Sequence, residues 1–235
     1  FVLYGILMEA ETPNSIRILC TSIATALLIL SHNAISLVSF AVAVLFALWI
    51  SPKSKNRLII LLPLLIGLGL TTFYWLPAIF ERKYTYGDLF MKDMYTSHFA
   101  PILTFFIPNF TNATKLQTGG ITVYFGLIQS LLFLYSLYLL FIKKIKDIHL
   151  RSITYFSLTL IAGSLFFMQS ISASIWEHVP TLRMFQFPWR LLSIVGLGTA
   201  LLGGLITLKP KKLQTTLLLL LSIITIATTT VFWSA

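Results

Sequence analysis

The chain has 235 residues, of which 57% are apolar and only 10% are charged, and its mean hydropathy is +0.89. A soluble domain usually carries about 25% charged residues, so this composition excludes an ordinary water-soluble domain. The formal net charge of +10 does not indicate a nucleic-acid partner, because the basic residues lie in short runs between apolar segments, as orientation signals do in membrane proteins. The single cysteine, Cys20, excludes an internal disulfide and a multi-cysteine metal site.

Long apolar segments follow one another along the whole chain. A membrane-spanning helix needs about 20 mostly apolar residues, and Phe1–Met8 resembles the end of an earlier helix of this kind. We therefore expect an all-α, polytopic bundle that forms one transmembrane domain, residues 1–235, the C-terminal portion of a longer membrane protein. About seven spans are expected, at about 16–31, 34–50, 58–80, 121–142, 152–171, 190–208 and 213–233.

Two features predict how these helices pack and bend. Small residues at every fourth position let two helices approach closely, and Gly196, Ala200 and Gly204 form such a stripe in the sixth span. A weaker contact of the same kind is expected at Gly67, in the third span. Pro63 and Pro77 can each bend that span where a neighbour satisfies the freed carbonyl group.

Basic residues mark one side of the predicted membrane domain. Three short connections and Arg17 hold 11 of the 17 Lys and Arg residues, whereas the loops at about 81–120 and 172–189 are longer and mix acidic and aromatic residues. The positive-inside rule places short basic loops in the cytoplasm, so the two longer loops are predicted outside a plasma (inner) membrane. The basic connections are 51–57, 143–151 and 209–212.

Motifs of soluble enzymes are absent, and no predicted span carries a charge at its centre. Candidate functional residues are therefore expected at the predicted outer surface. His32 and Asn33, between the first two spans, could bind an anionic head group. The alternative is a turn in which Asn33 or Ser31 caps the next helix. Glu81 and Asp88 begin the first outer loop; they could act as general bases or belong to a solvated loop.

Two further candidates follow in the sequence. His98 begins an apolar segment, 98–106, which is too short to span a membrane and is expected to be interfacial or re-entrant. Arg190 lies at the outer edge of the sixth span. Its planar guanidinium could bind a lipid phosphate, or its side chain could extend to the interface as an anchor.

Four segments, in a consistent order, resemble a known family. The family is the bacterial 6-pyruvoyl-tetrahydropterin synthase-related membrane domain, which is similar in layout to the membrane-embedded glycosyltransferases of the GT-C class. The segments are LLILSHNAISLVSF at 27–40, GLGLTTFYWLPAIFERKY at 67–84, SHFAPILTFFIPNF at 97–110 and FQFPWRLL at 185–192.

This resemblance implies a glycosyltransferase-like protein of the cell envelope. Its partners would be the lipid bilayer and a polyprenyl-phosphate-linked sugar, used at the outer membrane face. In GT-C enzymes the essential carboxylate lies in an early outer loop, so the catalytic residue is expected upstream of Phe1 and is unknown here. No metal ligands are predicted in this chain, although a divalent metal ion is a candidate cofactor for such a reaction. The alternatives are a non-catalytic protein that binds or translocates lipid-linked glycans, and a purely structural membrane domain.

The predicted orientation can be tested by labelling single cysteines, after Cys20 is replaced by serine. A cysteine at Lys55 or Lys144 should resist an impermeant thiol reagent in intact cells, because both positions lie in basic, cytoplasmic connections. A cysteine at Lys92, in the first outer loop, should react. Labelling at both Lys55 and Lys144 would contradict this orientation.

Overall fold

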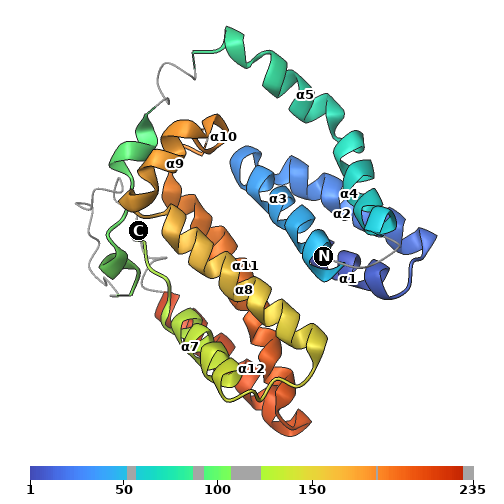
Figure 1. The fold of residues 1–235 in the computed structure, drawn as a ribbon, viewed down its shortest axis with the longest axis vertical. Coiled ribbons are helices and arrows are strands. Elements are labelled where there is room, and N and C mark those ends of the chain that lie inside the picture. Colours follow the sequence, from blue (N-terminus) through green and yellow to red (C-terminus); the bar gives the residue numbers. More distant parts are fainter. Residues whose placement is uncertain (52–56, 87–92, 107–122, 184, 230–235) are drawn as a thin grey trace. The chain divides into compact units, whose positions relative to one another are not determined.

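All regular structure in the described part of the chain is helical (Figure 1), which confirms the all-α prediction. The described residues fall into two units, Phe1–Lys92 and Asp93–Ala235. The computed structural model describes residues 1–51, 57–86, 93–106, 123–183 and 185–229.

Two helices of the first unit, α2 (Ser15–Ser31) and α3 (Asn33–Ile50), begin at polar caps. The Asn14 side chain accepts a hydrogen bond of 2.8 Å from the Ile16 backbone N–H at the start of α2. His32 does the same for α3, with Ile35 N as the donor at 3.3 Å. Such caps satisfy backbone groups that the first helical turn leaves unpaired. The elements are α1 (Val2–Glu11), α2 (Ser15–Ser31), α3 (Asn33–Ile50), α4 (Arg57–Leu70), α5 (Thr72–Phe80) and the 3₁₀ helix η1 (Arg82–Tyr84).

Small and hydroxyl-bearing residues form the contact between α2 and α4. Ser22 and Thr25 are buried on α2, and each hydroxyl donates to its own helix, Ser22 to the Ile18 carbonyl at 2.7 Å and Thr25 to the Thr21 carbonyl at 2.8 Å. A Cβ atom at Gly67 would lie only 2.5 Å from Cβ of Thr25 and 2.8 Å from the Ser22 carbonyl oxygen. The close contact predicted at Gly67 is therefore confirmed.

A bend of 67° separates α4 from α5. It lies at Thr71, between the two helices, and not at Pro63 or Pro77, the positions expected from the sequence. The carbonyl of Leu68 accepts hydrogen bonds from the Thr71 N–H at 3.3 Å, from the Thr71 hydroxyl at 3.1 Å and from the Trp75 indole at 2.9 Å. The two side-chain donors stabilise the bend by supplementing the backbone hydrogen bonding at the break.

The second unit is built around α8 (Ile148–Phe167) and α11 (Leu192–Gly203). The predicted outer loop 172–189 contains short helices, and the segment beginning at His98 contains only 3₁₀ turns, so it does not form a spanning helix. The elements are η2 (Met94–Ser97), η3 (Ile102–Phe105), α7 (Leu127–Phe141), α8 (Ile148–Phe167), η4 (Ser170–Ser172), α9 (Ala173–His178), α10 (Pro180–Arg183), η5 (Pro188–Leu191), α11 (Leu192–Gly203), η6 (Gly204–Leu208) and α12 (Lys211–Thr229).

The face of α11 that packs on α8 differs from the predicted one. Gly196, Ala200 and Gly204 are exposed, and a Cβ atom at either glycine would meet nothing within 4 Å. Gly198 makes the close contact, since its Cβ would lie 2.8 Å from Cγ1 of Ile161. The stripe prediction is thus wrong within this unit, because the opposite face carries larger side chains whose burial contributes more. The buried residues of α11 are Ile194, Val195, Gly198, Thr199 and Leu202.

Several helices have the length and composition of membrane spans. Within the described residues, four helical segments could cross a membrane, and the bent pair α4–α5 would make a fifth. Two other predicted spans correspond to α2 and α7, which are apolar but have only 17 and 15 residues. The apolar helices indicate a membrane-embedded protein, whereas the number seven stays a prediction. The four segments are Asn33–Ile50, Ile148–Phe167, Pro188–Leu208 and Lys211–Thr228.

Gly67 and Gly69 offer a matched pair on α4. Gly67→Ala should lower the stability by about 1–3 kcal/mol, because the added methyl group meets a backbone carbonyl that cannot rotate away. Gly69→Ala should be neutral or stabilising by up to about 1 kcal/mol through helix propensity, since its Cβ would enter open space. Thermal unfolding of both variants in detergent measures the difference. Equal effects would show that α2 and α4 do not touch there.

Candidate functional site

The predicted site residues are divided between the two units. The first unit contains His32, Asn33 and Glu81, and the second contains His98 and Arg190. Asp88 lies outside the described residues. Each unit is therefore treated by itself.

The polar residues of the first unit have structural partners. His32 caps α3 through its ring nitrogen, so the cap is made by His32 and not by Ser31 or Asn33 as the sequence suggested. The Tyr74 hydroxyl of α5 donates to the Asn33 side-chain oxygen, which fixes α5 to the turn between α2 and α3. Glu81 is exposed at the end of α5. These contacts account for His32 and Asn33 without a ligand.

In the second unit, His98 and Arg190 meet at one aromatic ring. The guanidinium carbon of Arg190 lies 4.9 Å from the centroid of the Phe187 ring. The His98 ring contacts the same phenyl ring edge-on, with centroids 4.7 Å apart, and Trp189 stacks on it at 5.5 Å. Residues 98 and 190, distant in sequence, are therefore brought to one place. An Arg held over a ring face is attracted to the ring electrons and has a fixed orientation.

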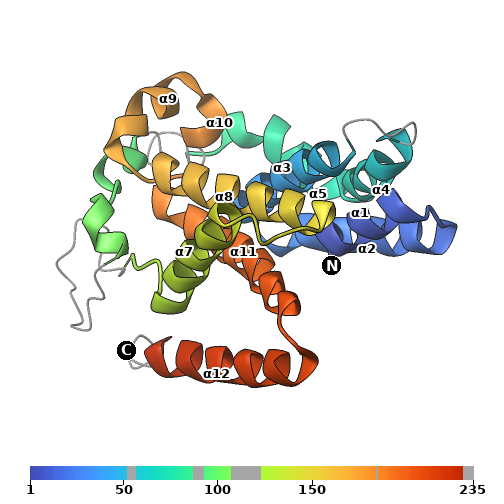
Figure 2. The same ribbon diagram turned by 60° about the horizontal axis from the view of Figure 1, so that its bottom comes forward.

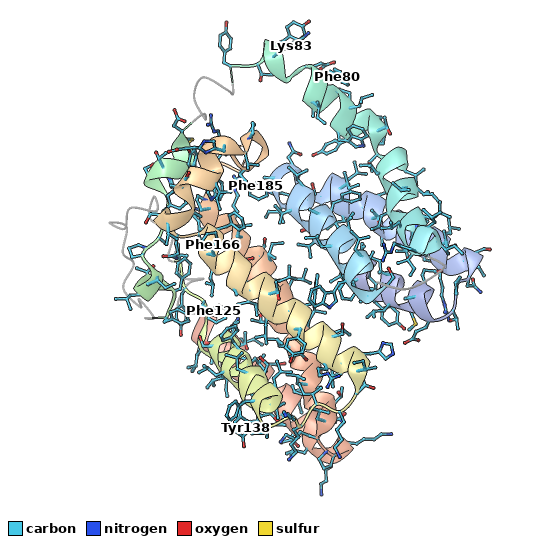
Figure 3. The ribbon with its side chains drawn as sticks, in the orientation of Figure 1. Phe80, Lys83, Phe125, Tyr138, Phe166 and Phe185 are labelled. Carbon is cyan, nitrogen blue, oxygen red and sulfur yellow. The ribbon has the colours of Figure 1, made fainter. Side chains whose placement is uncertain are left out.

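The backbone around Phe187 is bent tightly. Gln186 has a φ angle of 61°, a left-handed conformation that is uncommon for a residue with a side chain and that often marks functional segments. The Phe187 N–H donates to the Phe185 carbonyl at 2.6 Å, and Arg190 Nη1 donates to the same carbonyl at 3.0 Å. Phe185 itself is buried, and it lies near the end of α8 that carries Phe166 (Figure 3). This turn positions both the phenyl ring and the guanidinium.

A second aromatic cluster holds His98 in place. Tyr95 and Trp176 are both buried and stack with centroids 5.5 Å apart, and Phe99 contacts both rings edge-on at 6.0 Å. The Trp176 indole donates to the Phe167 carbonyl at 3.0 Å, which ties the cluster to the C-terminal end of α8. Aromatic pairs of this kind add about 0.5–1.5 kcal/mol beyond their burial.

The hydrogen bonds of His98 indicate which ring nitrogen carries the proton and which is available to a ligand. Nδ1 lies 2.5 Å from the Met94 carbonyl oxygen, which can only accept, so Nδ1 carries the proton. In the neutral ring Nε2 is then an acceptor for a hydroxyl group, and in the protonated ring it is a donor to an anion. We call this region, with His98, Arg190 and the rings of Tyr95, Phe99, Trp176, Phe187 and Trp189, the aromatic end.

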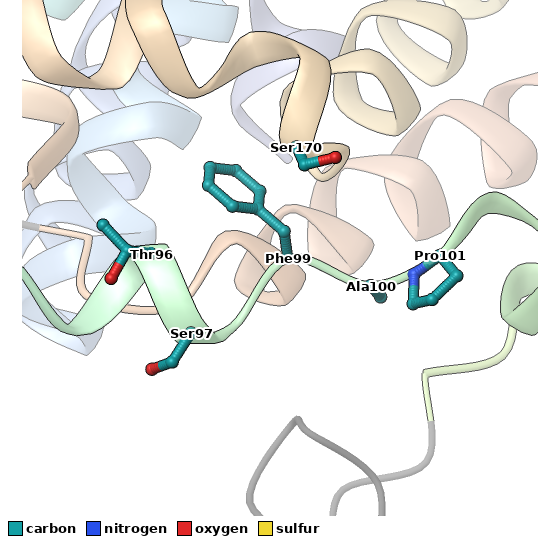
Figure 4. Close-up of a pocket in the computed structure, with 6 residues that line it drawn as sticks. All are labelled: Thr96, Ser97, Phe99, Ala100, Pro101 and Ser170. Atoms are coloured by element: carbon teal, nitrogen blue, oxygen red, sulfur yellow. The ribbon is translucent and has the colours of Figure 1, made fainter.

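A cavity of about 550 Å³ is formed between Ser170 and residues 96–101 (Figure 4). Ser97 and Phe99, the two chain neighbours of His98, are both part of its wall. Its size is typical of small-molecule sites, which span about 300–1,000 Å³. Three hydroxyl groups and one aromatic ring line it. The lining residues are Thr96, Ser97, Phe99, Ala100, Pro101 and Ser170.

Several residues of interest gave little signal in the sequence. The buried donors Trp189 Nε1 and Gln169 Nε2 have no partner in the described structure, and such groups are costly unless a ligand or water satisfies them. In the sequence, Trp189 was indicated only by its place in the aromatic segment 185–190, next to Arg190.

Glu9 is fully buried in the first unit. One of its oxygens accepts from Asn14 N at 3.2 Å, and the other, within the described residues, has no donor.

The described residues contain no group of three or more His, Cys, Asp or Glu side chains that could hold a metal ion. Comparison of the chain with protein-family models, with curated proteins and with solved structures found no match. The resemblance to the 6-pyruvoyl-tetrahydropterin synthase-related membrane domain therefore stays a prediction, and the site itself is the basis for a functional proposal.

Proposed function

We propose that this is a membrane-embedded, glycosyltransferase-like protein whose aromatic end binds a polyprenyl-phosphate-linked sugar. The observation that carries the proposal is the convergence of His98 and Arg190 on Phe187, together with a cavity that is lined by the two chain neighbours of His98. Arg190 would bind the phosphate, the cavity would hold the sugar, and the apolar helices would accommodate the polyprenyl chain.

The phosphate assignment follows from the geometry of Arg190. A guanidinium has five N–H donors in one plane, and the structure uses Nη1 for the Phe185 carbonyl. The remaining donors can bind phosphate oxygens in a bidentate arrangement. Stacking on Phe187 fixes the plane in advance, so that less entropy is lost on binding.

The sugar assignment follows from the walls of the cavity. Thr96 and Ser97 donate their hydroxyl protons to backbone carbonyls, at 2.8 and 3.2 Å. The Thr96 oxygen therefore remains an acceptor for a hydroxyl group of a sugar, whereas the Ser97 oxygen also lies 3.0 Å from Nδ1 of His98. Phe99 provides an apolar wall. Exposed Ile102 and Leu103 follow directly in the chain and suit the start of a lipid chain.

A non-catalytic protein that binds or translocates lipid-linked glycans is the second candidate. Asp93 and Glu177 of this unit are exposed, and neither carboxylate hydrogen-bonds to His98 or Arg190 in the described structure. Sugar transfer needs a base to activate the acceptor, or a carboxylate that holds a metal ion. Transfer would thus require a carboxylate from elsewhere in the protein, whereas binding would not.

Substitution of Arg190 tests the proposal. Arg190→Gln should weaken binding of a polyprenyl phosphate by about tenfold or more, because a charge-assisted hydrogen bond contributes about 1.5–3 kcal/mol. Arg190→Lys should bind with intermediate affinity, since an ammonium group keeps the charge but lacks the planar fork. Binding to the purified chain in detergent, with melting temperatures recorded for each variant, gives the comparison.

Arg183→Gln is the matched control. The Arg183 guanidinium donates to the backbone carbonyls of Trp176 and Glu177, so its loss should affect stability more than affinity. Phe187→Leu should weaken binding without removing any charge, because the guanidinium loses its support. Full affinity in both Arg190 variants would show that Arg190 serves only as an anchor and would refute the phosphate assignment.

A further inference from the structure

Two basic segments, distant in the sequence, lie at the same end of the second unit. Gly198 of α11 packs against Ile161 and Ser157 of α8, and the two helices run antiparallel, so the chain leaves η6 on the side of the unit where α8 begins (Figures 1 and 2). Nζ of Lys209 lies 5.7 Å from the centroid of the Tyr135 ring on α7. The connection after η6 therefore lies beside α7, the helix from which the other basic connection starts.

This region carries a large excess of positive charge. Its one carboxylate, Asp147, accepts a hydrogen bond of 2.7 Å from the Leu150 N–H and so caps α8. All the basic side chains are exposed except that of Lys209, which is half-buried. We call this region the basic end; its residues are Lys143, Lys144, Lys146, Arg151, Lys209, Lys211 and Lys212.

The backbone that carries these lysines is held in place. Lys143 has a φ angle of 53°, and the Lys143 and Lys144 N–H groups donate to the last carbonyls of α7, both at 3.0 Å. Ile145 is buried and pins the middle of the connection. On the other segment, the Gln214 side chain donates to the Lys209 carbonyl at 2.7 Å. The basic end is thus largely pre-organised.

Exposed apolar side chains border the lysines. Phe141 is 86% exposed and Ile148 is 59% exposed, at the two ends of the connection between α7 and α8, and Leu213 follows Lys212 on the exposed helix α12. A nucleic acid or an acidic peptide would leave this apolar rim in water. A phospholipid matches both parts, with its phosphate at the lysines and its acyl chains along α7 and α12.

We propose that the basic end binds the head groups of anionic phospholipids of the bilayer. This site is separate from the aromatic end, because the two lie at opposite ends of α8, about 30 Å apart for a helix of 20 residues. Each Lys or Arg near an anionic membrane surface contributes about 1 kcal/mol. The inference does not depend on the proposed binding of a polyprenyl-phosphate-linked sugar.

Lipid binding to the purified chain tests this site. The chain is titrated in detergent micelles with phosphatidylglycerol or phosphatidylcholine, and bound lipid is counted by native mass spectrometry. We expect preferential retention of phosphatidylglycerol. The variant K143Q/K144Q/K146Q should bind it about 100-fold more weakly, as the loss of three basic side chains implies. The variant K209Q/K211Q/K212Q should behave alike, because both segments lie at the same end of the unit.

The control variant R82Q/K83Q/K115Q removes three basic residues that lie elsewhere in the sequence. It should keep the affinity, and an equal loss would overturn the proposal by showing that only net charge matters. Displacement of the lipid by inorganic phosphate at equal concentration would also overturn it, as would tighter binding of a single-stranded oligonucleotide. Arg190→Gln should leave phosphatidylglycerol binding unchanged, which separates this test from that of the aromatic end.

Discussion

The close approach of α11 to α8 at Gly198 determines the layout of the second unit. A side chain at this position would meet Ile161, so only glycine allows the two backbones to pack at this distance. Because the pair is antiparallel, the segment between α8 and α11 lies at one end of the pair, and the connection after η6 lies toward the other (Figure 1). Both the aromatic end and the basic end exist because these two helices lie side by side.

The two ends present positive charge in different ways. At the aromatic end a single guanidinium is held by a phenyl ring and a backbone carbonyl, an arrangement that suits one phosphate in one orientation. At the basic end, lysines project from two ordered connections, and their ammonium groups are mobile point charges. The first arrangement favours selectivity for a particular ligand, and the second favours the general attraction of an anionic surface.

The positions of the helices, which depend mainly on the distribution of apolar residues, were predicted well from the sequence. Apolar runs located most helices, and the predicted span 34–50 differs from α3, Asn33–Ile50, by a single residue. The face of α11 was missed because a small-residue stripe competes with the burial of Ile194, Val195 and Leu202 on the opposite face. The bend at Thr71 was missed because prolines are the stronger local signal for a kink.

The features of the candidate site that the sequence did not predict depend on contacts between residues distant in the chain. Arg190 and His98 were both singled out, yet nothing local connects them; their meeting depends on Phe187 and on the stack of Tyr95 and Trp176. The burial of Glu9 was likewise unpredictable, since a carboxylate near a helix end is usually solvated.

The lengths of α2 and α7 have a consequence for the surrounding membrane. With 17 and 15 residues and a rise of about 1.5 Å per residue, they extend about 26 and 23 Å, less than a hydrocarbon core of about 30 Å. If both helices cross the membrane, as the sequence predicts, lipids beside them must shorten or tilt, at a cost of a fraction of a kcal/mol per ångström of hydrophobic mismatch. A bilayer of short acyl chains would relieve this cost, so the protein should be more stable in thin membranes than in thick ones.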